Sequence, residues 1–161
     1  MRILTMDLRA TSSGKLLMWI YRQSTGQLFR TDPSYRDWNA DSSNYRRSEL
    51  EPSPSPILVA TCYSGRDWNS PAGDVFLGRN NPALQDVANV GPIPRGRYHI
   101  GPFGDYTAPL TPYPDTDTFG RIGLFFRVLK NGFDSGGSII IDEDTKRLII
   151  GLRDQLLLVV E

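Results

Sequence analysis

Few side chains of this chain could act as a nucleophile or a base. Among its 161 residues there is one cysteine, Cys62, and one histidine, His99. A thiolate activated by an imidazole is a common catalytic pair. However, His99 lies in an expected strand over residues 97–100, where alternation places it opposite Tyr98 and Ile100, as a surface or hydrogen-bonded residue. Cys62 ends an expected strand and is typical of a small buried apolar residue.

The sequence also gives little reason to expect a metal or a cofactor. A zinc site needs three or four ligands rich in nitrogen and sulfur, and one cysteine with one histidine is too few. Asp115 and Asp117 could hold calcium, but a plain polar loop explains them as well. The acidic run 142–144 is better explained as the capped start of a helix. We therefore expect no metal and no cofactor.

Composition favours one globular domain over residues 1–161, of which 39% are hydrophobic and 22% charged. Eighteen basic residues balance eighteen acidic ones, so nothing attracts nucleic acid or an anionic membrane over a long range. No apolar run is long enough to insert into a membrane, and no cleaved signal is recognisable. We expect a protein that is cytoplasmic or that is exported without a cleaved signal.

Short segments separated by 12 prolines and 15 glycines indicate a mainly β fold with one or two short helices. Alternating or buried apolar patterns predict the strands, at residues 16–22, 27–31, 57–63, 97–100, 123–129, 138–141 and 155–160. Residues 32–56 form a polar excursion. Residues 102–119 are a proline-rich segment, either a functional flap or a plain surface connection. Asp142 is expected to cap a helix over residues 143–150, which Gly151 ends.

Several short blocks occur in an informative order along the chain. They are residues 19–28 (WIYRQSTGQL), 63–65 (YSG), 80–82 (NNP), 91–101 (GPIPRGRYHIG), 126–129 (FRVL), 135–141 (SGGSIII) and 158–160 (LVV). This order resembles the type VI secretion L,D-transpeptidase effector family, a branch of the YkuD-like L,D-transpeptidases. The resemblance covers residues 16–160, and the block at 91–101 is its most specific part.

The resemblance implies a YkuD-like β-sandwich that acts on peptidoglycan stem peptides, and it makes the type VI route one option for export. In such enzymes a cysteine thiolate attacks a peptide bond, a histidine supplies the base, and backbone N–H groups stabilise the oxyanion. It further implies a set of residues that contact the substrate. Transferred to this chain, they are Tyr63, Ser64, Gly65, Ser135, Gly136 and Gly137. Arg121 and Arg127 flank the expected cleft, where they could either pair with the carboxylates of a stem peptide or form salt bridges at a strand edge.

The chain departs from the family at both catalytic positions. Where the family has Phe-x-Ile-His-Gly, this sequence places Leu129 at the histidine. Where the family has Ser-x-Gly-Cys-Ile, it places Ser138 at the cysteine. Leucine cannot accept a proton, and losing a positioned base costs about 10²–10⁴ in rate. A serine hydroxyl needs that base more than a thiol does.

These substitutions favour a non-catalytic domain that binds stem peptides or a protein partner. Two alternatives remain open at this point. One is an active L,D-carboxypeptidase or transpeptidase toxin acting on peptidoglycan tetrapeptides, with Ser138 as nucleophile. The other is an engineered Ser138, against which Leu129 argues, because a trapped enzyme would need only one change.

Overall fold

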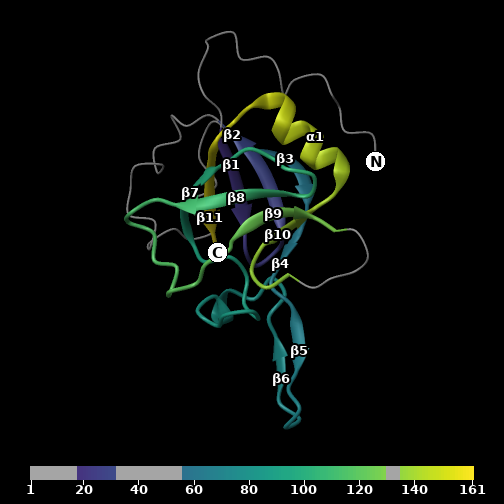
Figure 1. Ribbon diagram of the computed structural model, residues 1–161, viewed down its shortest axis with the longest axis vertical. Coiled ribbons are helices and arrows are strands. Elements are labelled where there is room, and N and C mark those ends of the chain that lie inside the picture. Colours follow the sequence, from purple (N-terminus) through teal and green to yellow (C-terminus); the bar gives the residue numbers. More distant parts are fainter. Residues whose placement is uncertain (1–17, 32–55, 130–134) are drawn as a thin grey trace.

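A nearly closed β-sheet surrounds the core of the chain (Figure 1). The computed structural model describes residues 18–31, 56–129 and 135–161. The sheet contains, in chain order, β1 (Met18–Arg22), β2 (Gln27–Thr31), β3 (Ile57–Thr61), β4 (Tyr63–Ser64), β7 (Gly96–Ile100), β8 (Thr107–Pro112), β9 (Phe125–Val128), β10 (Ile139–Ile141) and β11 (Leu156–Val160). The mainly β prediction is confirmed.

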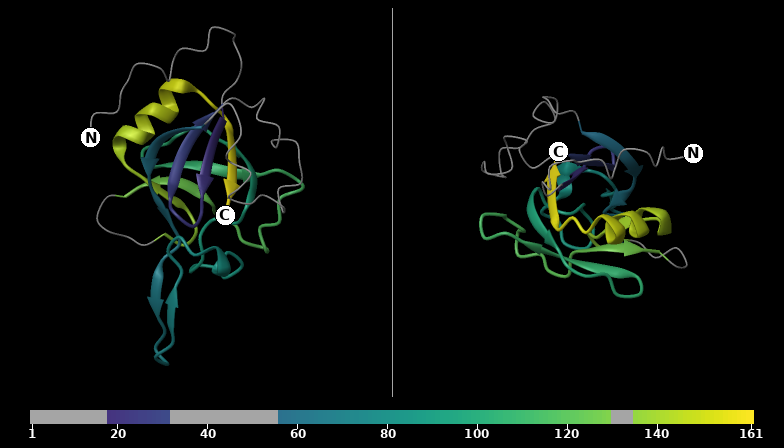
Figure 2. Two further views of the ribbon diagram at one scale, coloured as in Figure 1. Left: turned by 180° about the vertical axis from the view of Figure 1, so that it is seen from behind. Right: turned by 90° about the horizontal axis from the view of Figure 1, so that it is seen from above.

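The order of the strands explains why the sheet nearly closes. It runs β3-β2-β1-β11-β7-β8-β9-β10-β4, so β3 and β4 lie at its two ends. In the chain these two strands are separated only by Cys62. One continuous segment thus pairs with β2 on one side and with β10 on the other. Seen from above, the strands follow a ring (Figure 2).

Alternation along the strands fills the interior. On β7, Tyr98 and Ile100 are buried while His99 is exposed, which confirms the predicted facing of the histidine. On β9, Phe126 and Val128 join the same core. The parallel neighbours β1 and β11 are buried on both faces, and such strands are expected to be continuous apolar runs.

Helix α1 (Glu143–Leu152) follows β10 and begins as predicted. The carboxylate of Asp142 accepts a hydrogen bond from the backbone N–H of Thr145 at 2.7 Å. Its predicted end is wrong, because Gly151 is still helical and Arg153 is the C-cap, with φ of 57°. A left-handed cap satisfies the last carbonyls, and the N–H of Arg153 donates to Ile149. A 3-10 helix, η3 (Pro82–Leu84), is the other short helix described.

The structure differs from the sequence interpretation in two connections. Residues 107–112 of the proline-rich segment form β8, between β7 and β9. The carbonyl of Pro109 accepts from Gly101, so this proline interrupts the ladder only at its missing N–H. Residues 67–77, for which no structure was predicted, form a separate hairpin of β5 (Asp67–Asn69) and β6 (Val75–Leu77).

Some predictions fall outside the described residues. The polar excursion at 32–56 is outside them except for Pro56, and so are the first residues of the 16–22 strand. Within the described part of the chain, no helix has the length and apolar character needed to cross a membrane.

Candidate functional site

The loop over residues 135–138, which carries the predicted nucleophile position, is positioned by β10 against β4. Ile139 lies opposite Ser64 in this antiparallel pair. The Ser64 hydroxyl donates to the carbonyl of Gly137 at 3.0 Å and accepts from the backbone N–H of Ile93 at 2.8 Å. Ser64 therefore ties this loop to the 91–101 block, and its hydroxyl is fully buried between them.

The loop is also closed by its own side chains. The Ser135 hydroxyl donates to the carbonyl of Ser138 and accepts from the N–H of Gly137. Gly137 has φ of 117°, and a Cβ at this position would lie 2.1 Å from the Arg121 guanidinium. Only glycine fits there, because a side chain would be strained and would displace the arginine. Ser138 itself is 4% exposed.

Arg121 fills the space behind the loop and binds backbone carbonyls from two separate segments. Its Nη1 donates to the carbonyls of Gln85 at 2.5 Å and Pro92 at 2.6 Å. Its Nη2 donates to the carbonyls of Gly91 at 2.9 Å and Gly136 at 3.2 Å. Burial lowers the pKa of Arg121, but a guanidinium stays charged in proteins. Arg121 thus holds these segments together, and both of its terminal nitrogens already donate to the protein. Its contact with a substrate stays a prediction.

The two predicted catalytic positions do not meet. In the parallel pair of β9 and β10, Ile139 lies opposite Phe126 and Ile141 lies opposite Val128. Ser138 precedes the paired segment and Leu129 follows it, so they lie at opposite ends. Four strand positions separate them in register, roughly 13 Å at about 3.3 Å per residue.

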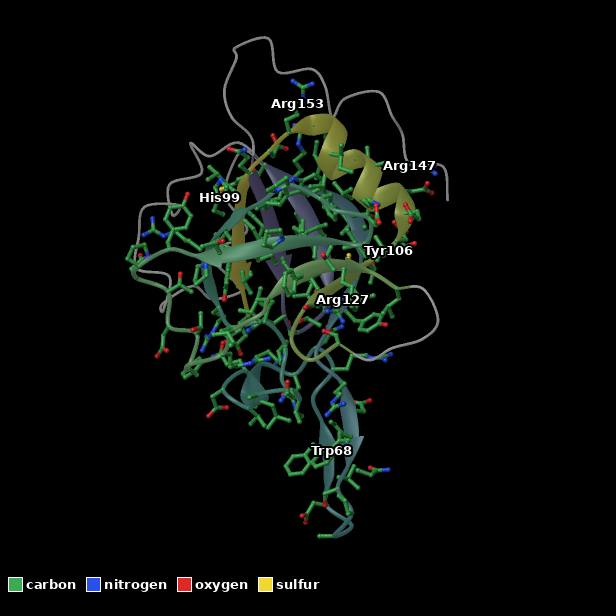
Figure 3. All side chains as sticks on the ribbon, in the orientation of Figure 1. Trp68, His99, Tyr106, Arg127, Arg147 and Arg153 are labelled. Atoms are coloured by element: carbon green, nitrogen blue, oxygen red, sulfur yellow. The ribbon has the colours of Figure 1, made fainter. Side chains whose placement is uncertain are left out.

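Neither Cys62 nor His99 replaces them. Burial, together with the smaller effect of the nearby Asp142 carboxylate, raises the pKa of the Cys62 thiol to about 12. Such a thiol is protonated at neutral pH and is inert as a nucleophile. His99 lies opposite Leu156 of β11 and Thr111 of β8, and its side chain is exposed. In Figure 3 the labelled His99 lies across β8 from Arg127.

One part of the predicted contact set does come together, on the outer face of β4, β9 and β10. Tyr63 and Arg127 lie opposite the same residue, Ile140, from its two sides. The Arg79 guanidinium lies 4.2 Å from the centre of the Tyr63 ring. The Nε of Arg127 is buried and has no hydrogen-bond partner among the described residues.

Tyr63, Arg79 and Arg127 are called the outer arginine row below. Sequence reasoning missed Arg79, because it lies in a turn after a hairpin that no apolar pattern announced. Gly65 stands beside this row with φ of 82°, and a Cβ there would lie 2.4 Å from the carbonyl of Gly78. It serves the close packing of the turn. Gly136 contributes to the site through its backbone carbonyl, which accepts a hydrogen bond from Arg121.

The described residues contain no group of three or more histidine, cysteine or acidic side chains that could hold a metal ion. The arrangement offers a rigid loop, a buried arginine that binds backbone carbonyls, Arg79 beside the Tyr63 ring, and Arg127 on the far side of β10 from Tyr63. This chemistry suits the binding of an anion, since guanidinium groups bind carboxylates directly. In comparisons with known proteins, no family model, no curated protein and no solved structure matches this chain.

Proposed function

We propose that this chain is a non-catalytic domain of the YkuD-like L,D-transpeptidase type, related to the type VI effectors, which binds peptidoglycan stem peptides. The order of the sequence blocks supports the relationship. The mainly β, nearly closed sheet is compatible with it. The proposal transfers the ligand class of the family, and it does not transfer the reaction.

The chemistry of the loop supports the absence of catalysis. A nucleophile needs an ionised form or a base within hydrogen-bond reach. Ser138 has Leu129 at the far end of the strand pair, and Cys62 keeps its proton because of burial. The serine hydroxyls at 64 and 135 are both used inside the protein. No described thiol or imidazole can take part in acyl transfer beside Ser138.

One observation supports binding. Arg127 is half-buried on the outer face of β9, and its Nε has no acceptor among the described residues. A buried donor without a partner costs about 1–3 kcal/mol. A ligand carboxylate bound by the Arg127 guanidinium would offset that cost if the side chain turns its Nε towards the ligand. A stem peptide carries several carboxylates, so Arg127 is the residue we assign to one of them.

Isothermal titration of the full chain with a stem tetrapeptide tests this proposal. We expect binding in the wild-type protein and at least a tenfold loss in Arg127→Ala, which corresponds to about 1.4 kcal/mol. Arg147→Ala is the matched control, because Arg147 is exposed and remote on α1. A tetrapeptide with amidated carboxylates should bind the wild-type protein no more tightly than the unmodified tetrapeptide binds Arg127→Ala. Absence of binding at millimolar peptide would overturn the choice of ligand.

Mass spectrometry of muropeptides tests the catalytic half. We expect no loss of terminal D-alanine with the wild-type protein. We also expect none with the double variant Ser138→Cys, Leu129→His, since the register separates the two positions by roughly 13 Å. Activity that disappears in Ser138→Ala would show instead that the chain is an active toxin.

A further inference from the structure

The hairpin of β5 and β6 protrudes from the sheet as an arm, residues 67–77 (Figures 1 and 2). Its apolar side chains are unusually exposed. Val75 is 64% exposed and Leu77 is 62% exposed, and they share one face of the arm. On the other face Trp68, 37% exposed, stacks on Phe76 with ring centroids 5.6 Å apart. An isolated two-stranded hairpin is only marginally stable in water. Side chains that stay exposed bury little apolar surface, so they do not stabilise the arm, and its fold does not explain why they are apolar.

The arm is nevertheless well formed. At its tip the N–H of Ser70 donates to the carbonyl of Asp74 at 2.7 Å, and the Ser70 hydroxyl accepts from the N–H of Asp74 at 3.0 Å. At its base the N–H of Gly78 donates to the carbonyl of Arg66 at 3.1 Å. A hairpin fixed at both ends presents its strands without further ordering, which lowers the entropic cost of binding.

In the described part of the chain β5 and β6 form a two-stranded sheet, so no described strand pairs with the outer edge of β6. Hydrogen-bonded pairs alternate along an antiparallel ladder, and the bonds at tip and base identify them as 66/78, 68/76 and 70/74. The N–H groups of Val75 and Leu77 therefore point away from β5. The carbonyl of Leu77 accepts one bond from Asn81 at 2.8 Å and has a second lone pair. Edge strands are usually protected by charge, proline or a bulge, and residues 75–77 contain no charge and no proline.

We propose that this edge binds the same edge of a second copy of the chain, as an antiparallel pair centred on Phe76. In this register Val75 of each copy lies opposite Leu77 of the other, with their outward N–H and C=O groups bonded. The two Phe76 rings meet on the opposite face. They extend the stack with Trp68 into one aromatic row across four strands.

Charge complementarity selects a second copy as the occupant. An acid, Asp74, precedes β6, and a base, Arg79, follows it after Gly78. Antiparallel pairing about Phe76 puts Asp74 opposite Gly78 of the other copy and beside its Arg79, twice by symmetry. The ring contact with Tyr63 uses the face of the Arg79 guanidinium and leaves its edge N–H donors for the carboxylate. The β5 edge has no such match, because Asp67 would face Asn69.

Sedimentation velocity over a wide concentration range tests the proposal on the full chain. We expect the wild-type mass to rise with concentration towards twice that of one chain. Val75→Lys with Leu77→Lys should keep the protein monomeric. Ile122→Lys is the control, because Ile122 is 91% exposed elsewhere and should leave association unchanged. A wild-type protein that stays monomeric at its highest soluble concentration overturns the proposal.

Charge exchange tests the register. Asp74→Arg alone and Arg79→Glu alone should each weaken association at least tenfold, because like charges then meet. An equimolar mixture of these two variants should associate again, as both contacts become attractive. Recovery in the mixture cannot come from a merely misfolded arm, and a mixture as weak as its components contradicts the register.

Amide hydrogen exchange gives a test inside the arm. Association should slow exchange at Val75 and Leu77 as concentration rises, and should leave Asp67 and Asn69 unchanged. The β5 amides are the internal control, since they lie on the other edge of the same hairpin. Protection that appears on β5 instead would show that another edge is used.

Discussion

The loop at residues 135–138 is bonded to Ser64, and the arm at residues 67–77 begins three residues after it, yet the two regions use their side chains in opposite ways. In the loop, the hydroxyls of Ser64 and Ser135 and the guanidinium of Arg121 all bind within the protein. In the arm, Val75 and Leu77 are 64% and 62% exposed, and no described strand pairs with the outward N–H groups of β6. The polar groups of the loop therefore stabilise the fold, whereas the apolar groups of the arm stay exposed for contact with other molecules.

The largest effect expected from this comparison is at Arg121. Arg121→Met keeps the apolar stem and removes the donors to four backbone carbonyls. Each buried acceptor left without a partner costs about 1–3 kcal/mol, and some will find water. We expect the free energy of unfolding in urea to fall by at least about 3 kcal/mol.

Arg147→Met is the control for the arginine substitution. Arg147 is 77% exposed and lies 3.8 Å from Asp144, so its loss should change stability by no more than about 0.5 kcal/mol. A similar small effect at Arg121 would mean that the loop is not held by its buried network, and the contrast with the arm would fail.

The sequence was sufficient for most of the sheet, because its strands alternate or are continuously apolar and are bounded by glycine and proline. It also located the N-terminus of α1, where the Asp142 cap has a local signature. It failed where position depends on distant partners. β8 contains prolines, but they fall where the ladder tolerates them. The two arm strands have three residues each and expose both faces, so no periodicity reveals them.

The candidate site was predicted less well than the fold, for the same reason. The role of Arg121 depends on carbonyls around residues 85–92 and at 136, which no local pattern brings together. The separation of Leu129 from Ser138 depends on the parallel register of β9 and β10. Motif spacing alone cannot fix that register. By contrast, the exposed facing of His99 followed from strand alternation, which is local.

An intermediate effect is expected at Cys62, which lies in the hydrophobic core. Burial raises the pKa of its thiol from an ordinary 9.0 to about 12. As pH rises above about 9, the thiol loses its proton in the unfolded chain but keeps it in the folded one. The unfolded state then binds fewer protons than the folded state, so the free energy of unfolding falls as pH rises. Between about pH 9 and pH 10 the wild-type protein should lose about 1 kcal/mol more than Cys62→Ala.

Urea denaturation of both proteins across this pH range measures the difference. Buried Tyr21 and Tyr98 also have raised pKa values, but both proteins contain them, so their contribution largely cancels. Equal pH dependence in the two proteins would mean that the thiol is accessible to water. Cys62 would then return as a candidate nucleophile.

The smallest effect is expected in the arm, and a matched pair of leucines makes it measurable. Leu77 is 62% exposed and Leu157 of β11 is fully buried, so the same change to alanine removes the same atoms from opposite surroundings. Leu157→Ala should lower the free energy of unfolding by about 2–5 kcal/mol through the cavity it leaves. Leu77→Ala should change it by less than about 0.5 kcal/mol when both are measured at concentrations too low for association. A large loss of stability from Leu77→Ala in the monomer would mean that the arm stabilises the nearly closed sheet. Its exposed side chains would then no longer require a second copy to explain them.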